Sequence, residues 1–214
     1  MESHPQVIAL SCSPSRGRNS DSMLDAFLEG FREKSDKSVE KIYLCDVPIE
    51  DYCFENSTGP REHETAFKEL CEKIQKTEAL IIATPTYNFS VPARLKNFID
   101  RIRFFALDFE HKSRLGQPGG KLVHLRTYFI VSGGTPLWAQ KLLFFTFPPF
   151  WLRGVFLYFG SHCLGAIYSG NVKAFENQRE LSKCFKRGKK FAKDMEKRRE
   201  NAPLERIFFR PPQV

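Results

Sequence analysis

Residues 11–23, SCSPSRGRNSDSM, gather hydroxyls, an amide and two arginines where an apolar run gives way to a helical pattern. Free N–H groups in the first turn of a helix bind phosphate, and short hydroxyl side chains add further donors. We predict a site for a terminal phosphate, in which the arginines supply countercharge. Its predicted residues are Ser13, Ser15, Arg16, Arg18, Asn19 and Ser20. The alternative is a turn without a ligand, in which Asn19 or Ser20 only caps the helix.

Two other loops carry unusual residues directly after apolar runs. Pro85 ends one run, and Tyr87, Asn88 and Phe89 follow it before the next helical segment begins at Pro92. The segment 131–134, VSGG, places two glycines after another run, which permits close approach of a ligand to the backbone. Each loop taken alone is equally well explained as a turn without a ligand.

The three loops together indicate one ligand. The carboxyl ends of parallel strands meet at one edge of a sheet, where ligands bind in folds of this class. A flat heterocycle that carries a phosphate suits this edge. The edge would offer a phosphate-binding loop, aromatic and amide side chains, and backbone that no side chain covers. Flavin mononucleotide (FMN) meets this description. The first loop has neither G-x-x-x-x-G-K-[ST] nor G-x-G-x-x-G, so a triphosphate or dinucleotide fingerprint is not supported.

The pattern along the chain supplies the elements that these loops require. Apolar runs alternate with segments of helical spacing, which is typical of an α/β fold with a parallel sheet covered by helices on both faces. The predicted strands are 6–12, 39–45, 78–84, 126–132 and 162–170, and the predicted helices are 20–34, 62–76, 92–105, a segment within 137–158, and a basic helix near the C-terminus. We expect one domain over residues 1–200 and a separate tail over 201–214.

The composition narrows the class of protein. The chain has 214 residues and a net charge of +8, but from Lys173 onward 13 Lys and Arg face 6 Asp and Glu, which leaves the rest nearly neutral. Apolar residues recur at helical spacing through that basic stretch, so its cations are expected on a solvated face. We expect no nucleic-acid partner, no membrane span and no metal site. Six scattered cysteines and no apolar leader predict reduced thiols and a cytoplasmic location.

The segment 85–102, PTYNFSVPARLKNFIDRI, resembles the P-x-Y-N-F-x-[IV]-P-x-x-L-K-x-x-x-D motif of the flavodoxin-like NAD(P)H-dependent FMN oxidoreductases. Within that family the chain is most similar to the FMN-dependent NADH-azoreductases and quinone reductases. The loop at 11–23 and the VSGG segment are similar to the family's phosphate and flavin loops, and the resemblance extends over about residues 6–195. It implies a flavodoxin-like three-layer sandwich with a five-stranded parallel sheet in the order 2-1-3-4-5.

The resemblance also implies roles for individual residues. The ring and ribityl chain of FMN would contact Pro85, Thr86, Tyr87, Asn88 and Phe89, and its pyrimidine side would contact Ser132, Gly133 and Gly134. In the family a nicotinamide gives hydride to flavin N5 and an electron-poor aromatic acceptor then replaces it. The N–H groups of Gly133 and Gly134 would stabilise the reduced ring, and the choice between NADH and NADPH stays open. Asp21 is a departure: it occupies a phosphate-loop position where the family often has a hydroxyl, and there it would compete with the phosphate.

Aromatic residues are abundant in two segments that the family uses for a dimer interface. The chain has 21 Phe, and the aromatic side chains concerned are Phe104, Phe105, Phe109, Phe144, Phe145, Phe147, Phe150 and Trp151. Core packing accounts for some of them. We expect the others to form an apolar slot for the aromatic acceptor, shared between the subunits of a homodimer.

Two alternatives to an enzyme remain open at this stage. A flavodoxin-like electron carrier would bind the same flavin and pass electrons to proteins, although such carriers are commonly acidic and this chain is basic. An interaction module would keep the fold, lose the flavin and use the basic C-terminal helix for contacts. Asp21 is the residue that favours the second alternative.

Overall fold

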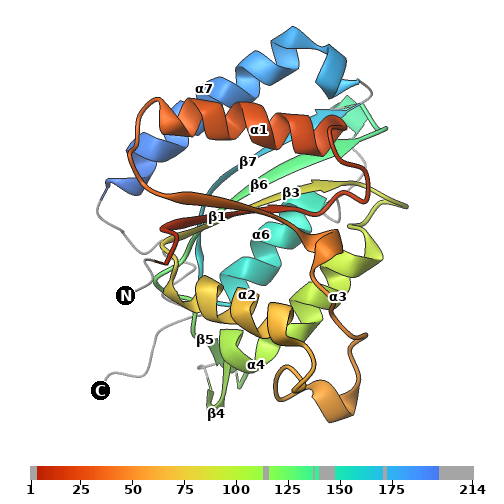
Figure 1. Cartoon of the computed structure of the whole chain (residues 1–214), viewed down its shortest axis with the longest axis vertical. Helices are drawn as coiled ribbons and strands as arrows, with labels where there is room; N and C mark the ends of the chain where they lie inside the picture. Colours follow the sequence, from red (N-terminus) through yellow and green to blue (C-terminus); the bar gives the residue numbers. More distant parts are fainter. Residues whose placement is uncertain (1–3, 113–115, 137, 140–147, 171–172, 198–214) are drawn as a thin grey trace.

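The computed structural model describes residues 4–112, 116–136, 138–139, 148–170 and 173–197. Five parallel strands form the central sheet in the order β2-β1-β3-β6-β7 (Figure 1). They are β1 (Val7–Ser11), β2 (Val39–Tyr43), β3 (Ala79–Pro85), β6 (Arg126–Gly133) and β7 (His162–Gly170). Numbered among themselves these strands run 2-1-3-4-5, so the predicted sheet and its order are confirmed.

Helices α1 (Asn19–Arg32) and α7 (Gln178–Met195) cover one face of the sheet (Figure 1). They cross at two glycines, where the backbones touch: a Cβ built on Gly188 would lie 1.9 Å from the carbonyl oxygen of Phe27. The apolar side of α7 is buried at Cys184, Phe191, Ala192 and Met195, and most of its Lys and Arg side chains are exposed. The expectation of a solvated basic face on this helix is confirmed.

The other face of the sheet carries α2 (Thr65–Lys76), α3 (Ala93–Arg101) and α6 (Pro148–Tyr158). Alternation along the strands builds both cores, because successive side chains point to opposite faces. Ile8 and Leu10 of β1 join the core under α2, α3 and α6, whereas Val7 and Ala9 join the core under α1 and α7.

The structure adds a two-stranded antiparallel sheet that the sequence analysis did not predict. It pairs β4 (Leu107–Lys112) with β5 (Pro118–Gly120), and the predicted helix over 92–105 is divided into α3 and the short α4 (Arg103–Ala106). Gly120 packs on the backbone of Phe159 and Gly160, which leaves no room for a Cβ. The predicted tail, 201–214, lies outside the described residues.

One face of α3 holds the long connection between β2 and α2. Arg94 donates to the carbonyl oxygens of Leu44 and Val47, and Asn97 Nδ2 donates to that of Glu50 at 2.9 Å. This connection contains the 3₁₀ turns η1 (Leu44–Asp46) and η2 (Phe54–Asn56). Within the described ranges, no helix has the length and apolar content needed to span a membrane.

Candidate functional site

The loops after β1, β3, β6 and β7 meet at the carboxyl edge of the sheet and enclose a cavity of about 650 Å³. A parallel sheet with helices on both faces leaves a crevice at this edge, where the direction of strand order changes. The predicted site residues that line the cavity are Ser13, Ser15, Arg18, Asn19, Ser20, Pro85, Thr86, Tyr87, Ser132, Gly133 and Gly134. The three loops chosen from the sequence therefore do converge.

The N-terminus of α1 forms one end of this cavity. Arg18 occupies the N-cap position, where no side chain accepts from the first-turn N–H groups. Asn19 instead accepts a hydrogen bond from the N–H of Ala174 at 2.8 Å, so the alternative in which Asn19 or Ser20 serves as the helix cap is wrong. A helix end whose N–H groups face a cavity uncapped is suited to an anion.

Two hydroxyls among the lining residues lack hydrogen-bond partners. Ser20 Oγ, in the first turn of α1, and Thr86 Oγ1, just after β3, are both buried and make no hydrogen bond within the described part of the chain. Buried polar groups are almost always paired, because an unpaired one costs about 1–3 kcal/mol. The two loops thus each hold a polar atom without a partner beside the same cavity, which favours a polar ligand.

A tight turn places Tyr87 at the rim. Tyr87 and Ser90 exchange two backbone hydrogen bonds of 2.9 Å, and the residues between them have positive φ, +48° at Asn88 and +61° at Phe89. Left-handed backbone is costly for a bulky residue such as phenylalanine, and such strain is concentrated at functional sites. Asn88 and Phe89 are exposed and are not part of the cavity lining.

The glycines after β6 leave bare backbone in the cavity wall. A Cβ on Gly133 would lie 2.5 Å from the hydroxyl of Tyr168, which donates to the carbonyl oxygen of Thr135 at 2.8 Å. Burial raises the pKa of Tyr168, so its hydroxyl stays a donor at neutral pH. Gly134 differs, because a Cβ there would meet nothing within 4 Å. Packing against Tyr168 thus explains why residue 133 is a glycine, whereas packing does not explain the glycine at 134.

Arg16 and Asp21 belong to the predicted phosphate loop but do not line the cavity. Arg16 pairs with Asp46 and lies over the ring of Tyr43, with its guanidinium carbon 4.3 Å from the ring centroid. Asp21 is buried on the side toward β2: its carboxylate accepts from Ser11 Oγ at 2.7 Å and pairs with Lys41 Nζ at 2.9 Å. The carboxylate that was expected to compete with a phosphate is therefore engaged elsewhere.

The charge on Asp21 also shapes the loop. Its second oxygen accepts from the N–H of Gly17 at 2.7 Å, and Gly17 has a φ of +65° that favours glycine. Burial raises the pKa of Asp21, but the bonds from Gly17, Lys41 and Ser11 outweigh burial and hold that pKa below its usual value. Asp21 is thus a charged anchor for the backbone of the β1–α1 loop.

Sequence reasoning missed Lys173 and Phe175, which line the same cavity from the segment after β7. The guanidinium of Arg18 lies over the ring of Phe175, with its central carbon 5.2 Å from the ring centroid. The predicted site residues all come from the loops after three of the five strands. The rule that ligands bind at the carboxyl ends applies equally to the last strand, and would have drawn attention to residues 171–176.

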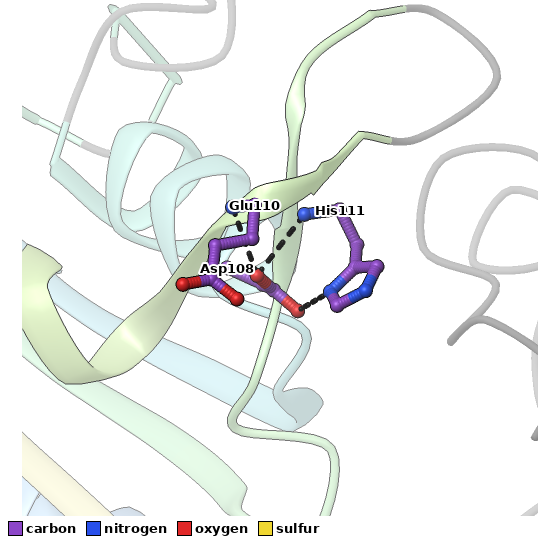
Figure 2. A group of neighbouring side chains, drawn as sticks. All are labelled: Asp108, Glu110 and His111. Atoms are coloured by element: carbon purple, nitrogen blue, oxygen red, sulfur yellow. Dashed lines mark hydrogen bonds and ion pairs between the residues drawn. The ribbon is translucent and has the colours of Figure 1, made fainter.

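A separate cluster on β4 has residue types that bind metals. Asp108, Glu110 and His111 bring one ligand atom each within 4.8 Å of one another (Figure 2). The Asp108 carboxylate accepts from the N–H groups of Glu110 and His111 and from Nδ1 of His111 at 2.9 Å. These bonds explain the cluster as a turn held by Asp108, and we assign it no metal.

Comparison with known proteins finds relatives that match more than half of the chain. The family profile of the NADPH-dependent FMN reductases matches residues 5–141. An iron-sulfur flavoprotein of Archaeoglobus fulgidus is 32% identical over 123 residues, which cover 55% of this chain and 53% of the relative. An FMN-dependent NADH:quinone oxidoreductase of Thiobacillus denitrificans is 34% identical over 124 residues, covering 53% and 60%. The matched segments thus span about half the length of these relatives.

Solved structures extend the likeness over nearly the whole chain. The NAD(P)H:quinone oxidoreductase of Methanothermobacter marburgensis superposes with a TM-score of 0.69, at 19% identity, over 91% of this chain and all of that one (100%). Similarity at this level of identity establishes the fold, and the predicted flavodoxin-like architecture is confirmed. The family rests on the profile, which matches more than half of the sequence and contains the loops after β1, β3 and β6. The chain belongs to the NADPH-dependent FMN reductase family.

Proposed function

We propose that this protein is an FMN-dependent NAD(P)H oxidoreductase that reduces quinones, azo compounds or similar flat aromatic acceptors. One observation carries the proposal: the hydroxyls of Ser20 and Thr86 have no hydrogen-bond partner among the described residues and are buried at the wall of one cavity, at a helix N-terminus and beside bare backbone. The phosphate of FMN is dianionic and suits the helix N-terminus beside Ser20. Its ring is flat and polar and suits the bare backbone and Thr86. The related quinone oxidoreductase of Thiobacillus denitrificans is FMN-dependent by name.

The residues present fit FMN, and each has a definable task. The N–H groups at the start of α1, with Ser20 and Arg18, would bind the phosphate. Thr86 would donate to the ring or ribityl chain, and Tyr87 at the rim would cover part of the flat surface. The backbone of Gly133 and Gly134 would donate to the pyrimidine edge, where negative charge grows on reduction. The bound flavin supplies hydride transfer, so the chain needs no acid-base pair of its own.

The test of this function is a titration of the purified chain with FMN, followed by NADH or NADPH. We expect a flavin absorbance spectrum on the protein and its bleaching by the nicotinamide in the absence of air. Gly134→Val is expected to weaken FMN binding at least tenfold and to change the free energy of unfolding by less than about 0.5 kcal/mol, because no atom of the described residues, apart from the two chain neighbours, lies within 4 Å of the new Cβ. A chain that stays colourless with excess FMN would refute the function.

Steady turnover distinguishes the enzyme from the electron carrier. The loaded protein is expected to oxidise NADH or NADPH continuously with benzoquinone, without an added reductase. FMN binding without such turnover would favour the carrier.

We further propose a homodimer that covers exposed aromatic side chains. Phe109, Trp138 and Phe150 are 53%, 69% and 50% exposed, whereas Phe105 is buried and Phe104 and Trp151 pack against the core. The other aromatics assigned to this interface, Phe144, Phe145 and Phe147, lie outside the described residues. Sedimentation of the FMN-loaded chain is expected to give a dimer, and a strict monomer would contradict it. A cytoplasmic location stays a prediction, supported by six free thiols.

A further inference from the structure

The cations at the phosphate end of the cavity come from two distant parts of the chain. Arg18 lies in the β1–α1 loop, and Lys173 follows β7. The sequence suggested that Arg16 and Arg18 would act together, but Arg16 is paired with Asp46 and stacked on Tyr43. Among the described residues, the lining therefore contains Lys173 and Arg18 as its Lys and Arg side chains.

The segment 173–175 is fixed against the phosphate loop. The N–H of Ala174 donates to Asn19 Oδ1 at 2.8 Å, and Ala174 itself is fully buried. On one side of this anchor Phe175 supports the guanidinium of Arg18. Lys173 lies on the other side of this anchor. Its backbone is therefore fixed next to the hydrogen bond between Ala174 and Asn19, in the first turn of α1.

The side chain of Lys173 is free to turn toward a ligand. It is 73% exposed, and its contact with Glu176 is an ion pair of 3.6 Å on the same short segment. Exposed pairs of this kind contribute little free energy, so a phosphate can replace the carboxylate at small cost. The buried hydroxyl of Ser20, which has no hydrogen-bond partner among the described residues, is a second and independent observation at the same end of the cavity.

We propose that Lys173 is a specificity-determining residue, which with Arg18 recognises the terminal phosphate and makes this chain select FMN over riboflavin. The inference rests on the proposed function and assigns its phosphate recognition to the segment after β7. A phosphate monoester carries close to two negative charges at neutral pH. Two cations, first-turn N–H groups and the Ser20 hydroxyl match that charge, whereas riboflavin ends in a neutral hydroxyl that offers no charge to them.

Dissociation constants for FMN and for riboflavin, measured by quenching of flavin fluorescence, test this inference. Lys173→Gln is expected to raise the FMN constant about five- to tenfold and to leave the riboflavin constant within about twofold. Lys173→Arg is expected to keep the wild-type preference. The FMN constant of Lys173→Gln should also depend less steeply on salt, since one charge contact is lost.

Two matched variants control for a general loss of positive charge. Arg16→Gln removes a cation from the phosphate loop itself, and Lys186→Gln removes an exposed cation of α7. Both are expected to change either constant by less than twofold. The inference is overturned if Lys173→Gln leaves FMN binding unchanged, weakens both flavins equally, or is matched by Arg16→Gln. Wild-type protein that binds neither flavin would refute the proposed function instead, so the two failures are distinguishable.

Discussion

Gly188→Ala is expected to lower the free energy of unfolding by about 3 kcal/mol, although helix propensity alone predicts a gain of about 1 kcal/mol. The new Cβ would lie 1.9 Å from the carbonyl oxygen of Phe27, and backbone atoms cannot turn aside as a flexible side chain can. Gly30 makes the reciprocal contact, with a Cβ position 2.0 Å from the carbonyl oxygen of Phe185. The two helices must therefore separate to admit the methyl group.

Separation of α1 and α7 also opens the aromatic cluster beneath them. Phe27 packs on Tyr128 and Phe191 with ring centroids 4.7 and 5.5 Å away, and all three rings are buried. Gly154→Ala is the matched control, because this exposed helical glycine has no contact within 4 Å of its Cβ position among the described residues. Urea unfolding should give opposite signs for the two variants. Equal effects would show that the crossing of the helices is not tight.

The two glycines at this crossing show what a sequence pattern can and cannot predict. Apolar periodicity predicts a buried side of the C-terminal helix, and Gly188 lies on that side. It gave no sign that Gly30 lies opposite, because a close approach between backbones depends on how two helices cross. The hairpin of β4 and β5 was missed for a similar reason: Gly120 in its second strand is selected by contact with Gly160, forty residues away in sequence.

The candidate site was predictable to the extent that the sheet topology determines it. Alternating strands and helices identify the edge where loops converge, and the loops after β1, β3 and β6 do line one cavity. The sequence did not predict which charged side chains pair with one another at that edge and which line the cavity. Arg16 and Arg18 are two residues apart, yet Asp46 of a neighbouring loop engages Arg16, and Lys173 from the far end of the chain joins Arg18.

Arg101→Met is expected to destabilise the fold by about 3–5 kcal/mol at neutral pH, because it leaves the Glu64 carboxylate buried without its cation. Arg101 donates to both oxygens of Glu64, at 2.9 and 2.6 Å, and both side chains are almost fully buried. Arg101 also donates to the carbonyl oxygen of Glu50 at 2.9 Å. The pair thus joins α3 to the start of α2 and to the connection before it.

The pH dependence of this variant separates lost charge pairing from lost packing. Burial alone raises the pKa of Glu64, but Arg101 and the N–H groups of Arg61 and Glu50 outweigh it and hold that pKa at about 2. A depressed pKa stabilises the fold above the ordinary value of 4.5, and this contribution, about 3 kcal/mol, is lost as the pH falls from 4.5 toward 2.

Without the guanidinium, burial is opposed only by the N–H groups of Arg61 and Glu50, so the pKa of Glu64 should rise well above 2, and protonation should cost the variant less stability than it costs the wild type. The difference in unfolding free energy between wild type and Arg101→Met is therefore expected to narrow as the pH falls from 7 to 3. Arg101→Met combined with Glu64→Gln should recover about half of the loss at pH 7, since the unpaired charge is gone. Lys96→Met breaks an exposed pair on the same helix and should cost less than about 0.5 kcal/mol. A difference that stays constant with pH would assign the effect of Arg101 to its packing on Phe67, 5.0 Å from the guanidinium carbon, and not to its charge.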